Sequence, residues 1–132
     1  MSTPQEIFQR YVLAGAIGRD ADALAALFTD DGVLEAPLVP DGDPYPKRLV
    51  GRDAIRAGVA ALHARLPVDG RAVDPTRTSV TIHPTPAGDT FVAEIDTAFT
   101  NGDTISLVQI FRLDGDRIRH LRDYFAPGVT AG

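Results

Sequence analysis

The chain contains no cysteine, no tryptophan and only one methionine. The absence of cysteine excludes disulfide bonds, thiolate nucleophiles and zinc sites built on thiolates. The three histidines, His63, His83 and His120, are scattered without the spacing that is typical of metal ligands. We therefore expect a protein that works without a metal ion or an organic cofactor.

An excess of positive charge is also missing. The chain has 13 lysines and arginines against 18 aspartates and glutamates, a formal net charge of −5. This balance offers no electrostatic footprint for nucleic acid or for an anionic membrane. No segment approaches the roughly 20 apolar residues that span a bilayer. Because the N-terminal sequence MSTPQEIFQRYV lacks the apolar core of a signal peptide, we expect a cytoplasmic protein.

Apolar residues are plentiful enough for one compact core. They make up 44% of the 132 residues, which predicts a single domain over residues 1–132. A helical period in the first half predicts three helices: one from Thr3 to Gly18, one capped by Asp20, and one after Gly51. Their expected apolar faces are Ile7, Phe8, Tyr11, Val12 and Gly15; then Leu24, Leu27 and Phe28; then Ile55, Val59, Leu62 and Leu66.

The second half has the period of two that is typical of strands. We expect strands at about 71–83, 90–100, 104–113 and 117–125, after an earlier short strand at 33–36. Asn101-Gly102 is a strong hairpin signal, whereas residues 40–46 have the composition of a surface loop. Helices first and strands afterwards predict an α+β fold, with helices packed on one side of a curved antiparallel sheet.

The last expected strand carries an acidic residue on its apolar face. Asp123 alternates in phase with Leu121 and Phe125. A carboxylate that faces an apolar space is costly unless it is paired or protonated, and such groups are candidate catalysts. Two simpler alternatives remain open: this face meets water, or Asp123 pairs with an arginine of a neighbouring strand.

The two preceding strands carry further polar candidates. On strand 104–113, Gln109 is the lone polar residue of the face that includes Phe111. A buried glutamine needs hydrogen-bond partners, which either a core hydroxyl such as that of Tyr11 or a bound ligand would supply. On strand 90–100, alternation alone places the Phe91 face in the core and sends Glu94 and Asp96 to solvent.

Four short motifs recur in a recognisable order. They are Tyr11, the run Leu27–Val33 followed by Pro37, the run Gly51–Ile55, and the terminal run Arg122–Phe125. Together they resemble the SnoaL-like branch of the nuclear transport factor two superfamily, which includes ketosteroid isomerase and limonene-epoxide hydrolase. The resemblance covers essentially the whole chain. It implies three N-terminal helices packed in a strongly curved antiparallel sheet that forms a cone-like pocket.

The resemblance to ketosteroid isomerase carries over only in part. Tyr11 matches the first-helix tyrosine that donates a hydrogen bond to the developing enolate. Gln109 matches the protonated aspartate that donates the second hydrogen bond. The position of the proton-moving base is occupied by Ala36, which has no acid–base chemistry. The usual isomerase mechanism is therefore not expected at that position.

The resemblance to limonene-epoxide hydrolase implies a different pair of acids. Asp123 matches one catalytic aspartate and Asp96 the second, while the bridging arginine is replaced by Glu94 and the water-holding tyrosine by Leu34. This match places Asp96 inside the cone, against the burial pattern. The apolar Phe91 face would then lie outside and need cover, so a catalytic Asp96 implies a homodimer through the outer sheet face and a monomer argues against it.

We therefore expect a small-molecule enzyme that uses cofactor-free general acid–base catalysis in an apolar pocket. Epoxide hydrolysis, cyclisation and isomerisation of a cyclic or polyketide-like substrate all fit, and a non-catalytic ligand-binding or dimerisation module is the alternative. The expected catalytic residues are Asp123 and Asp96, and the expected substrate-binding residues are Tyr11, Gln109, Glu94, Leu34 and Phe111.

Overall fold

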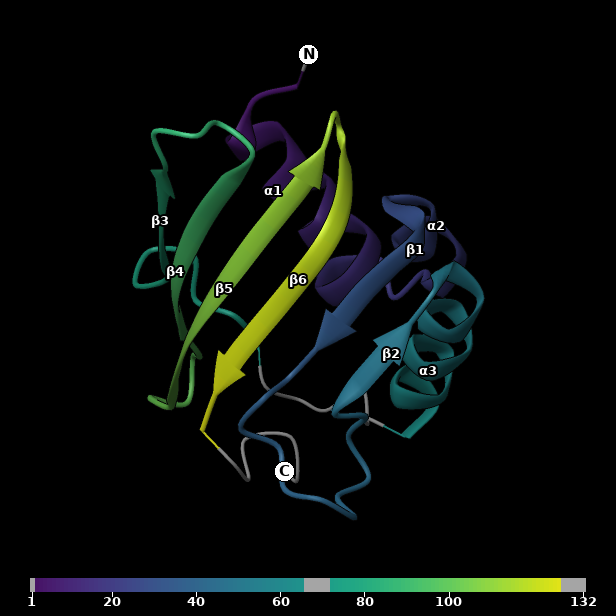
Figure 1. Ribbon diagram of the computed structural model, residues 1–132. Helices are drawn as coiled ribbons and strands as arrows, with labels where there is room; N and C mark the ends of the chain where they lie inside the picture. Colours follow the sequence, from purple (N-terminus) through teal and green to yellow (C-terminus); the bar gives the residue numbers. More distant parts are fainter. Residues whose placement is uncertain (1, 66–71, 127–132) are drawn as a thin grey trace.

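The computed structural model describes residues 2–65 and 72–126 of the chain. Three α-helices and one π-helical turn accompany a six-stranded sheet, in an order that interleaves the first two strands with the helices (Figure 1). The elements are α1 (Pro4–Val12), η1 (Leu13–Ile17), α2 (Ala21–Ala26), β1 (Phe28–Glu35), β2 (Arg48–Val50), α3 (Arg52–Arg65), β3 (Ser79–Pro84), β4 (Thr90–Ala98), β5 (Thr104–Asp114) and β6 (Arg117–Phe125).

The predicted helix starts are confirmed. The Thr3 hydroxyl accepts a hydrogen bond from the Glu6 amide at 3.2 Å, and the Glu6 carboxylate accepts one from the Thr3 amide at 3.0 Å. This capping box satisfies two amides that would otherwise lack partners. Asp20 caps α2 with a single hydrogen bond, which its carboxylate accepts from the Ala23 amide at 3.0 Å. After Val12 the first helix continues as the π-helical turn η1, which we did not expect.

The strand order is β2-β1-β6-β5-β4-β3. Every neighbouring pair is antiparallel except β1 and β6, which run parallel. The predicted α+β class is thus confirmed, but the expectation of a purely antiparallel sheet is wrong. Alternation along a strand reports which face is buried and carries no information on the direction of its neighbours. The parallel pair joins segments that lie far apart in the sequence.

Strand β1 is longer than expected because it begins at Phe28, which we placed on the second helix. Phe28 pairs with Ile118 of β6 and is fully buried. The short strand β2 was not predicted. The expected strand at 71–83 is observed as β3, preceded by a bridge between Val73 and Phe99; residue 71 and the predicted helix residue Leu66 lie outside the described residues.

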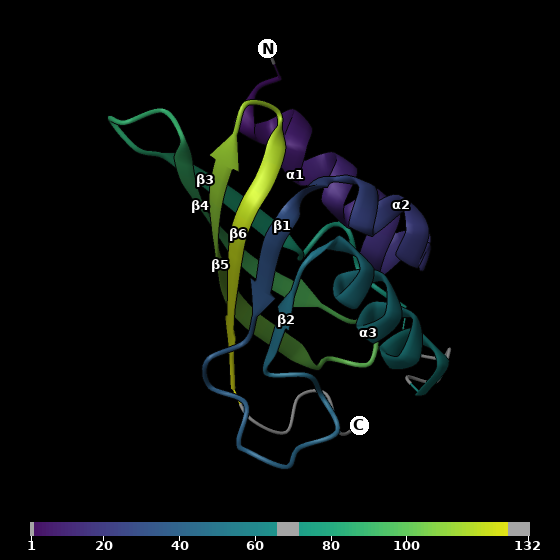
Figure 2. The same cartoon turned by 45° about the vertical axis from the view of Figure 1, so that its right-hand side comes forward.

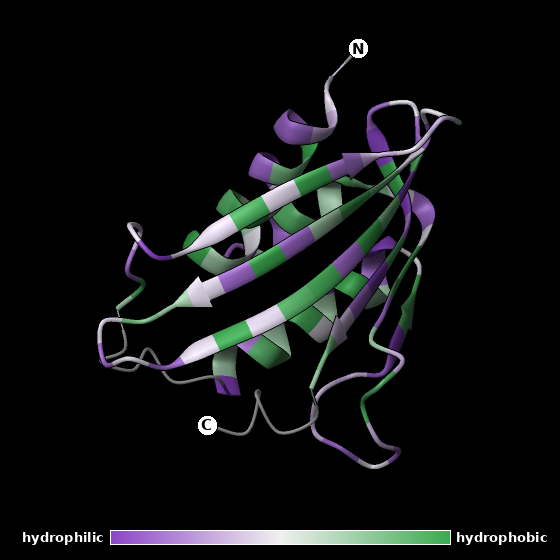
Figure 3. Cartoon of the chain, turned by 90° about the vertical axis from the view of Figure 1, so that its left-hand side faces the viewer, coloured by the Kyte–Doolittle hydropathy of each residue, from purple (hydrophilic) through white to green (hydrophobic). Residues whose placement is uncertain are grey.

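All three α-helices lie against the same, concave side of the sheet (Figure 2). Hydrophobic and hydrophilic residues alternate along the strands (Figure 3), and the hydrophobic ones on the inner face form the core with the helices. The rings of Phe91 and Phe111 stack at its centre, with centroids 4.6 Å apart and planes 8° from parallel. None of the described helices is long and apolar enough to cross a lipid bilayer.

Arg52 fastens the start of α3 to the sheet. Its guanidinium donates to the Phe28 carbonyl at 2.7 Å and pairs with Asp30 at 2.7 Å. Arg52 thus links the first residue of α3 to β1. The helix in turn supplies one wall of the pocket described next.

Candidate active site

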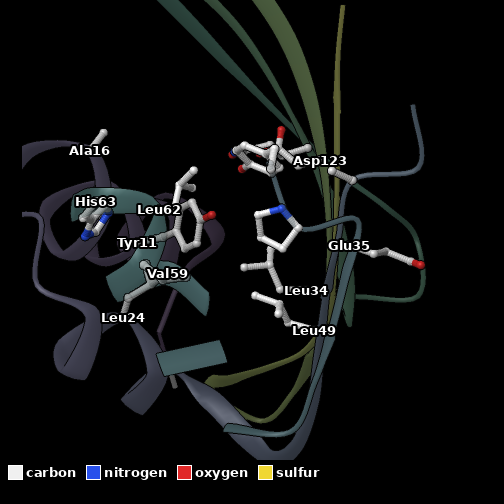
Figure 4. A pocket seen from close by; sticks show the side chains of 15 residues that line it. Tyr11, Ala16, Leu24, Leu34, Glu35, Leu49, Val59, Leu62, His63 and Asp123 are labelled. Carbon is white, nitrogen blue, oxygen red and sulfur yellow. The ribbon is translucent and has the colours of Figure 1, made fainter. Parts of the chain in front are cut away.

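A cavity of about 200 Å³ lies between the helices and the concave face of the sheet. Its walls come from α1, η1, α2 and α3 on the helical side, and from β1, β2, β5, β6 and the β1–β2 loop on the side of the sheet. Most of the lining is apolar, and Figure 4 shows how several of the side chains converge. The apolar lining residues include Leu24, Leu34, Leu49, Val59 and Leu62.

Asp123 reaches this cavity from β6, as its alternation predicts. Its side chain lies on the inner face with Leu121 and Phe125, and the residue retains 9% exposure. Burial raises the pKa of Asp123 to about 6, although a hydrogen bond from the Gln109 side chain opposes the rise. Its Oδ1 atom is buried and has no hydrogen-bond partner among the described residues. A carboxyl group in this state can both accept and release a proton near neutral pH.

Gln109 lies beside Asp123 on the adjacent strand β5, where the two residues are register partners. It is 6% exposed and lines the cavity. Because its amide donates to Asp123, the atom left over is Oε1, which is buried and unpartnered within the described part of the chain. The Gln109 amide nitrogen therefore binds the Asp123 carboxylate, and its carbonyl oxygen remains available to accept a hydrogen bond.

Tyr11 lines the opposite wall, with its hydroxyl directed into the cavity (Figure 4). The edge of its ring packs on Phe111, with centroids 5.4 Å apart and planes at 87°. Burial and the negative charge of Asp123 hold the pKa of Tyr11 well above its usual range. The phenol therefore stays protonated and available as a hydrogen-bond donor when Asp123 is ionised.

The remaining expected pocket residues divide into two groups. Leu34 lines the cavity, and Ala36, which also lines it, presents only a methyl group. Phe111 is fully buried behind the wall and supports Tyr11, so it packs the site and does not line it.

Asp96 and Glu94 do not enter this cavity. Both lie on the outer face of β4, where Asp96 accepts a hydrogen bond from the Ser106 hydroxyl at 2.6 Å and Glu94 pairs with His83 at 2.5 Å. The expectation that Asp96 shares a pocket with Asp123 is wrong. The reason is burial. The inner face of β4 carries Phe91 and Ala93, which are almost completely buried. Because successive side chains of a strand point to opposite faces, Glu94 and Asp96 must face outward.

The same register removes the original reason for a dimer. We expected a partner subunit to cover the apolar Phe91 face, but this face packs against the helices and forms the core of the molecule. The described cavity lining includes one other acidic residue, Glu35. Its carboxylate points away from the cavity (Figure 4) and pairs with His120 and Arg122 instead.

Besides Glu35, two titratable residues line the cavity that sequence reasoning did not assign to it. Tyr45 comes from the β1–β2 loop, and His63 comes from α3. Burial and the charge of Arg19 lower the pKa of His63, which keeps its imidazole neutral at pH 7. An aromatic residue within the proline-rich stretch 40–46 was the available signal for Tyr45; His63, next to Leu62 on its helix, offered none.

The donor set does not suit a metal ion. Within residues 2–65 and 72–126, no group of three or more histidine, aspartate or glutamate side chains could hold one. Apart from Glu35, whose carboxylate points away from the cavity (Figure 4), the polar side chains of the lining supply one carboxyl, one amide, two phenols and one imidazole. This set is suited to moving protons and to binding a small polar group within an apolar enclosure.

Solved structures with the same architecture come from several bacteria. A Bacillus subtilis protein provisionally described as an isomerase matches with a TM-score of 0.70 and 20% identity, over 92% of this chain and 84% of that one. A Catenulispora acidiphila protein with a ketosteroid isomerase-like fold, in complex with trimethylamine, matches with a TM-score of 0.64 and 22% identity, over 95% and 88%. An NTF2-like protein of unknown function from Burkholderia xenovorans matches with a TM-score of 0.60 and 22% identity, over 93% and 82%.

These likenesses show the fold. A comparison with curated proteins gave no match. The family model of the SnoaL-like domain matches residues 8–121. This range includes all the cavity-lining residues except Asp123. The chain therefore belongs to the SnoaL-like branch of the nuclear transport factor two superfamily.

Proposed function

We propose that the chain catalyses proton transfer on a small, largely apolar carbonyl compound, with Asp123 as the general base. The carboxylate removes a proton from the carbon next to the carbonyl, and the electron pair moves onto the carbonyl oxygen. Tyr11 donates a hydrogen bond to this oxygen as negative charge develops. The observation that carries the proposal is the convergence of a buried carboxylate and a buried phenol from opposite walls of one apolar cavity.

This chemistry narrows the reactions that fitted the sequence. The epoxide opening that the resemblance to limonene-epoxide hydrolase implies needs both Asp123 and Asp96. Asp96 lies outside the cavity. Isomerisation and cyclisation share the proton abstraction described above. They differ only in whether the enolate then accepts a proton at another carbon or attacks a second carbonyl group. One carboxylate with one phenol donor is sufficient for this shared step.

The volume of the cavity limits the size of the substrate. Its 200 Å³ is below the roughly 300–1,000 Å³ of pockets that hold drug-sized ligands. We therefore propose a monocyclic or open-chain ketone and not a fused-ring compound.

Solvent deuterium exchange into a panel of small cyclic and open-chain ketones, followed by proton NMR, tests the proposal. Asp123→Asn should reduce the exchange rate by roughly 10²–10⁴-fold, which is the usual contribution of a positioned general base. Asp96→Asn is the matched control, because it makes the same chemical change on the outer face. Equal exchange by the wild type and Asp123→Asn would refute the assignment of the base.

A second candidate function is the binding of a small amine without catalysis. Two observations favour it: the acceptors Asp123 Oδ1 and Gln109 Oε1 lack donors among the described residues, and the Catenulispora acidiphila protein was solved with trimethylamine. An ammonium group would supply a donor and a positive charge. Binding of trimethylammonium should then lower the pKa of Asp123, which carbon NMR of its carboxyl group measures. An unchanged pKa of Asp123 would contradict this candidate function.

We also propose a second copy of the chain as a partner on the outer sheet face. An apolar stripe crosses this face from Val92 through Val108 and Ile110 to Tyr124. Acidic side chains lie on the β4 side, whereas Arg112 and Arg122 lie on the other side with Arg48 and Glu35. A two-fold axis along β5, between two stacked sheets, brings the acids of each copy opposite the arginines of the other.

Sedimentation equilibrium tests this partner. The double variant Glu94→Lys/Asp96→Lys should dissociate the dimer, because it opposes lysines to arginines. Asp22→Lys/Asp53→Lys, with the same change of charge on the helical side, should leave the dimer intact. A wild type that sediments as a monomer would refute the dimer and leave the proposal for Asp123 unaffected.

A further inference from the structure

The β1–β2 loop is an ordered part of the cavity wall. A backbone hydrogen bond from the Ala36 amide to the Lys47 carbonyl, 2.8 Å long, closes its neck. Val39 within the loop is 4% exposed and packs with Ala36 and Phe125 in a small apolar cluster of its own. Such a cluster is typical of compact loops that hold functional residues in place.

Tyr45 is the residue that this loop delivers to the cavity. Its amide donates to the Asp43 carboxylate at 2.8 Å, which fixes the backbone at this point. The edge of its ring packs against Phe125, with centroids 5.1 Å apart and planes at 70°. Because Phe125 is two residues beyond Asp123 on the same face of β6, this contact anchors the phenol beside the carboxylate.

The carboxyl group of Asp123 and the phenols of Tyr11 and Tyr45 lie close enough to influence one another. The charge of Asp123 adds to burial in raising the pKa of Tyr45, and Tyr45 contributes to the raised pKa of Tyr11. Both phenols therefore remain protonated donors when the carboxylate is ionised. They reach the cavity from different elements, Tyr11 from α1 and Tyr45 from the loop.

The site needs a second donor that the sequence had assigned to Gln109. In the structure the Gln109 amide donates to Asp123, and the atom that it leaves free is the acceptor Oε1. An acceptor cannot stabilise negative charge that develops on oxygen. Among the side chains that line the cavity, Tyr45 supplies a second phenol donor, close enough to Asp123 to feel its charge.

We propose that Tyr45 is a second hydrogen-bond donor to the substrate oxygen, so that Tyr11 and Tyr45 together form the oxyanion-binding site of the cavity. This inference rests on the proposed function and deepens it. The ligand is an oxygen with two lone pairs, a ketone that becomes an enolate, bound between a phenol of the first helix and a phenol of the loop. Two donors that are fixed before the reaction stabilise the developing charge more than one mobile donor.

Binding of 4-nitrophenolate tests the inference without catalysis. This probe presents one negatively charged oxygen on a small ring, and its ionised and neutral forms absorb at different wavelengths. Tyr45→Phe removes the donor but keeps the ring on Phe125. We expect it to weaken binding of the ionised probe roughly 10- to 100-fold, the usual value of a hydrogen bond to a charged group. Tyr124→Phe on the outer face is the matched control and should bind as the wild type does.

Solvent deuterium exchange into ketones gives a second measurement of the role of Tyr45. Tyr45→Phe should lower kcat with little change in KM, because the hydrogen bond strengthens as charge develops. Equal binding of 4-nitrophenolate by Tyr45→Phe and the wild type, or no binding by the wild type, would overturn the role of Tyr45. Full exchange activity in Asp123→Asn would instead overturn the proposed function, so the two failures are distinguishable.

Discussion

Replacement of Asp123 by asparagine should make the folded chain more stable at neutral pH. The aspartate carries its charge in a buried position with one hydrogen bond from Gln109. Asparagine has the same shape, can accept the same hydrogen bond and has no charge to desolvate. A residue whose removal stabilises the fold is one that the fold holds at a cost, as is common at functional sites.

The size of the effect follows from the pKa of the carboxyl. It stands at about 6 in the folded chain against a reference value of 3.8. At about 1.36 kcal/mol per pH unit, this difference corresponds to about 3 kcal/mol. Because the folded pKa is the higher one, the folded chain binds the proton more tightly. The stabilisation by the bound proton is complete below the unfolded value of 3.8 and is lost as the pH rises through about 6.

Urea unfolding followed by circular dichroism, at a series of pH values from about 4 to about 8, measures this difference. Asp123→Asn should match the wild type at the acidic end and exceed its free energy of unfolding by about 3 kcal/mol at the alkaline end. Asp96→Asn, on the exposed outer face, serves as the control and should show no such rise. A stability difference for Asp123→Asn that does not change with pH would refute the burial argument.

Three further outcomes follow from the same geometry. The rate of ketone exchange should rise with pH around a midpoint of about 6 and then level off, because the base must be ionised; a flat profile would exclude Asp123. Phe111→Ala should lower the free energy of unfolding in urea by about 3–5 kcal/mol, because the ring is fully buried between Phe91 and Tyr11; a loss within the error of the measurement would contradict this packing. Gly58→Ala would bring a methyl group to 2.6 Å from Leu49 Cδ1 and push that cavity-lining side chain inward, so calorimetry should show that larger ketones lose affinity before small ones; an equal loss for all sizes would contradict a change in cavity volume.

The parts of the site that the sequence predicts are those governed by local alternation. Asp123 and Gln109 each occupy the inner side of a strand whose other inner residues are apolar, and both line the cavity. The alternation of β4 likewise predicted that Asp96 faces outward. The error arose when the resemblance to a catalytic pair was preferred to the burial pattern, since a shift of one residue in register reverses the face of every side chain.

The parts that could not be predicted depend on contacts between distant segments. The parallel pairing of β1 with β6 joins Leu34 to Leu121, and no local pattern reports such a partner. The short strand β2 exists because β1 offers it an edge. Tyr45 lies in a stretch of prolines, aspartates and glycine that has the composition of an exposed loop. Only the packing of its ring on Phe125 shows that this loop closes the cavity.

The position of β6 between β1 and β5 has a consequence for how the chain folds. The strand that carries Asp123 follows all the other strands in sequence, yet it occupies the interior of the sheet. During synthesis, β1 and β5 must therefore wait for a neighbour that is made after both of them. The carboxylate, its amide partner and the apolar enclosure then come together in one late step. A peptide with the sequence of β6, added to a chain that ends before β6, should accordingly restore the pocket.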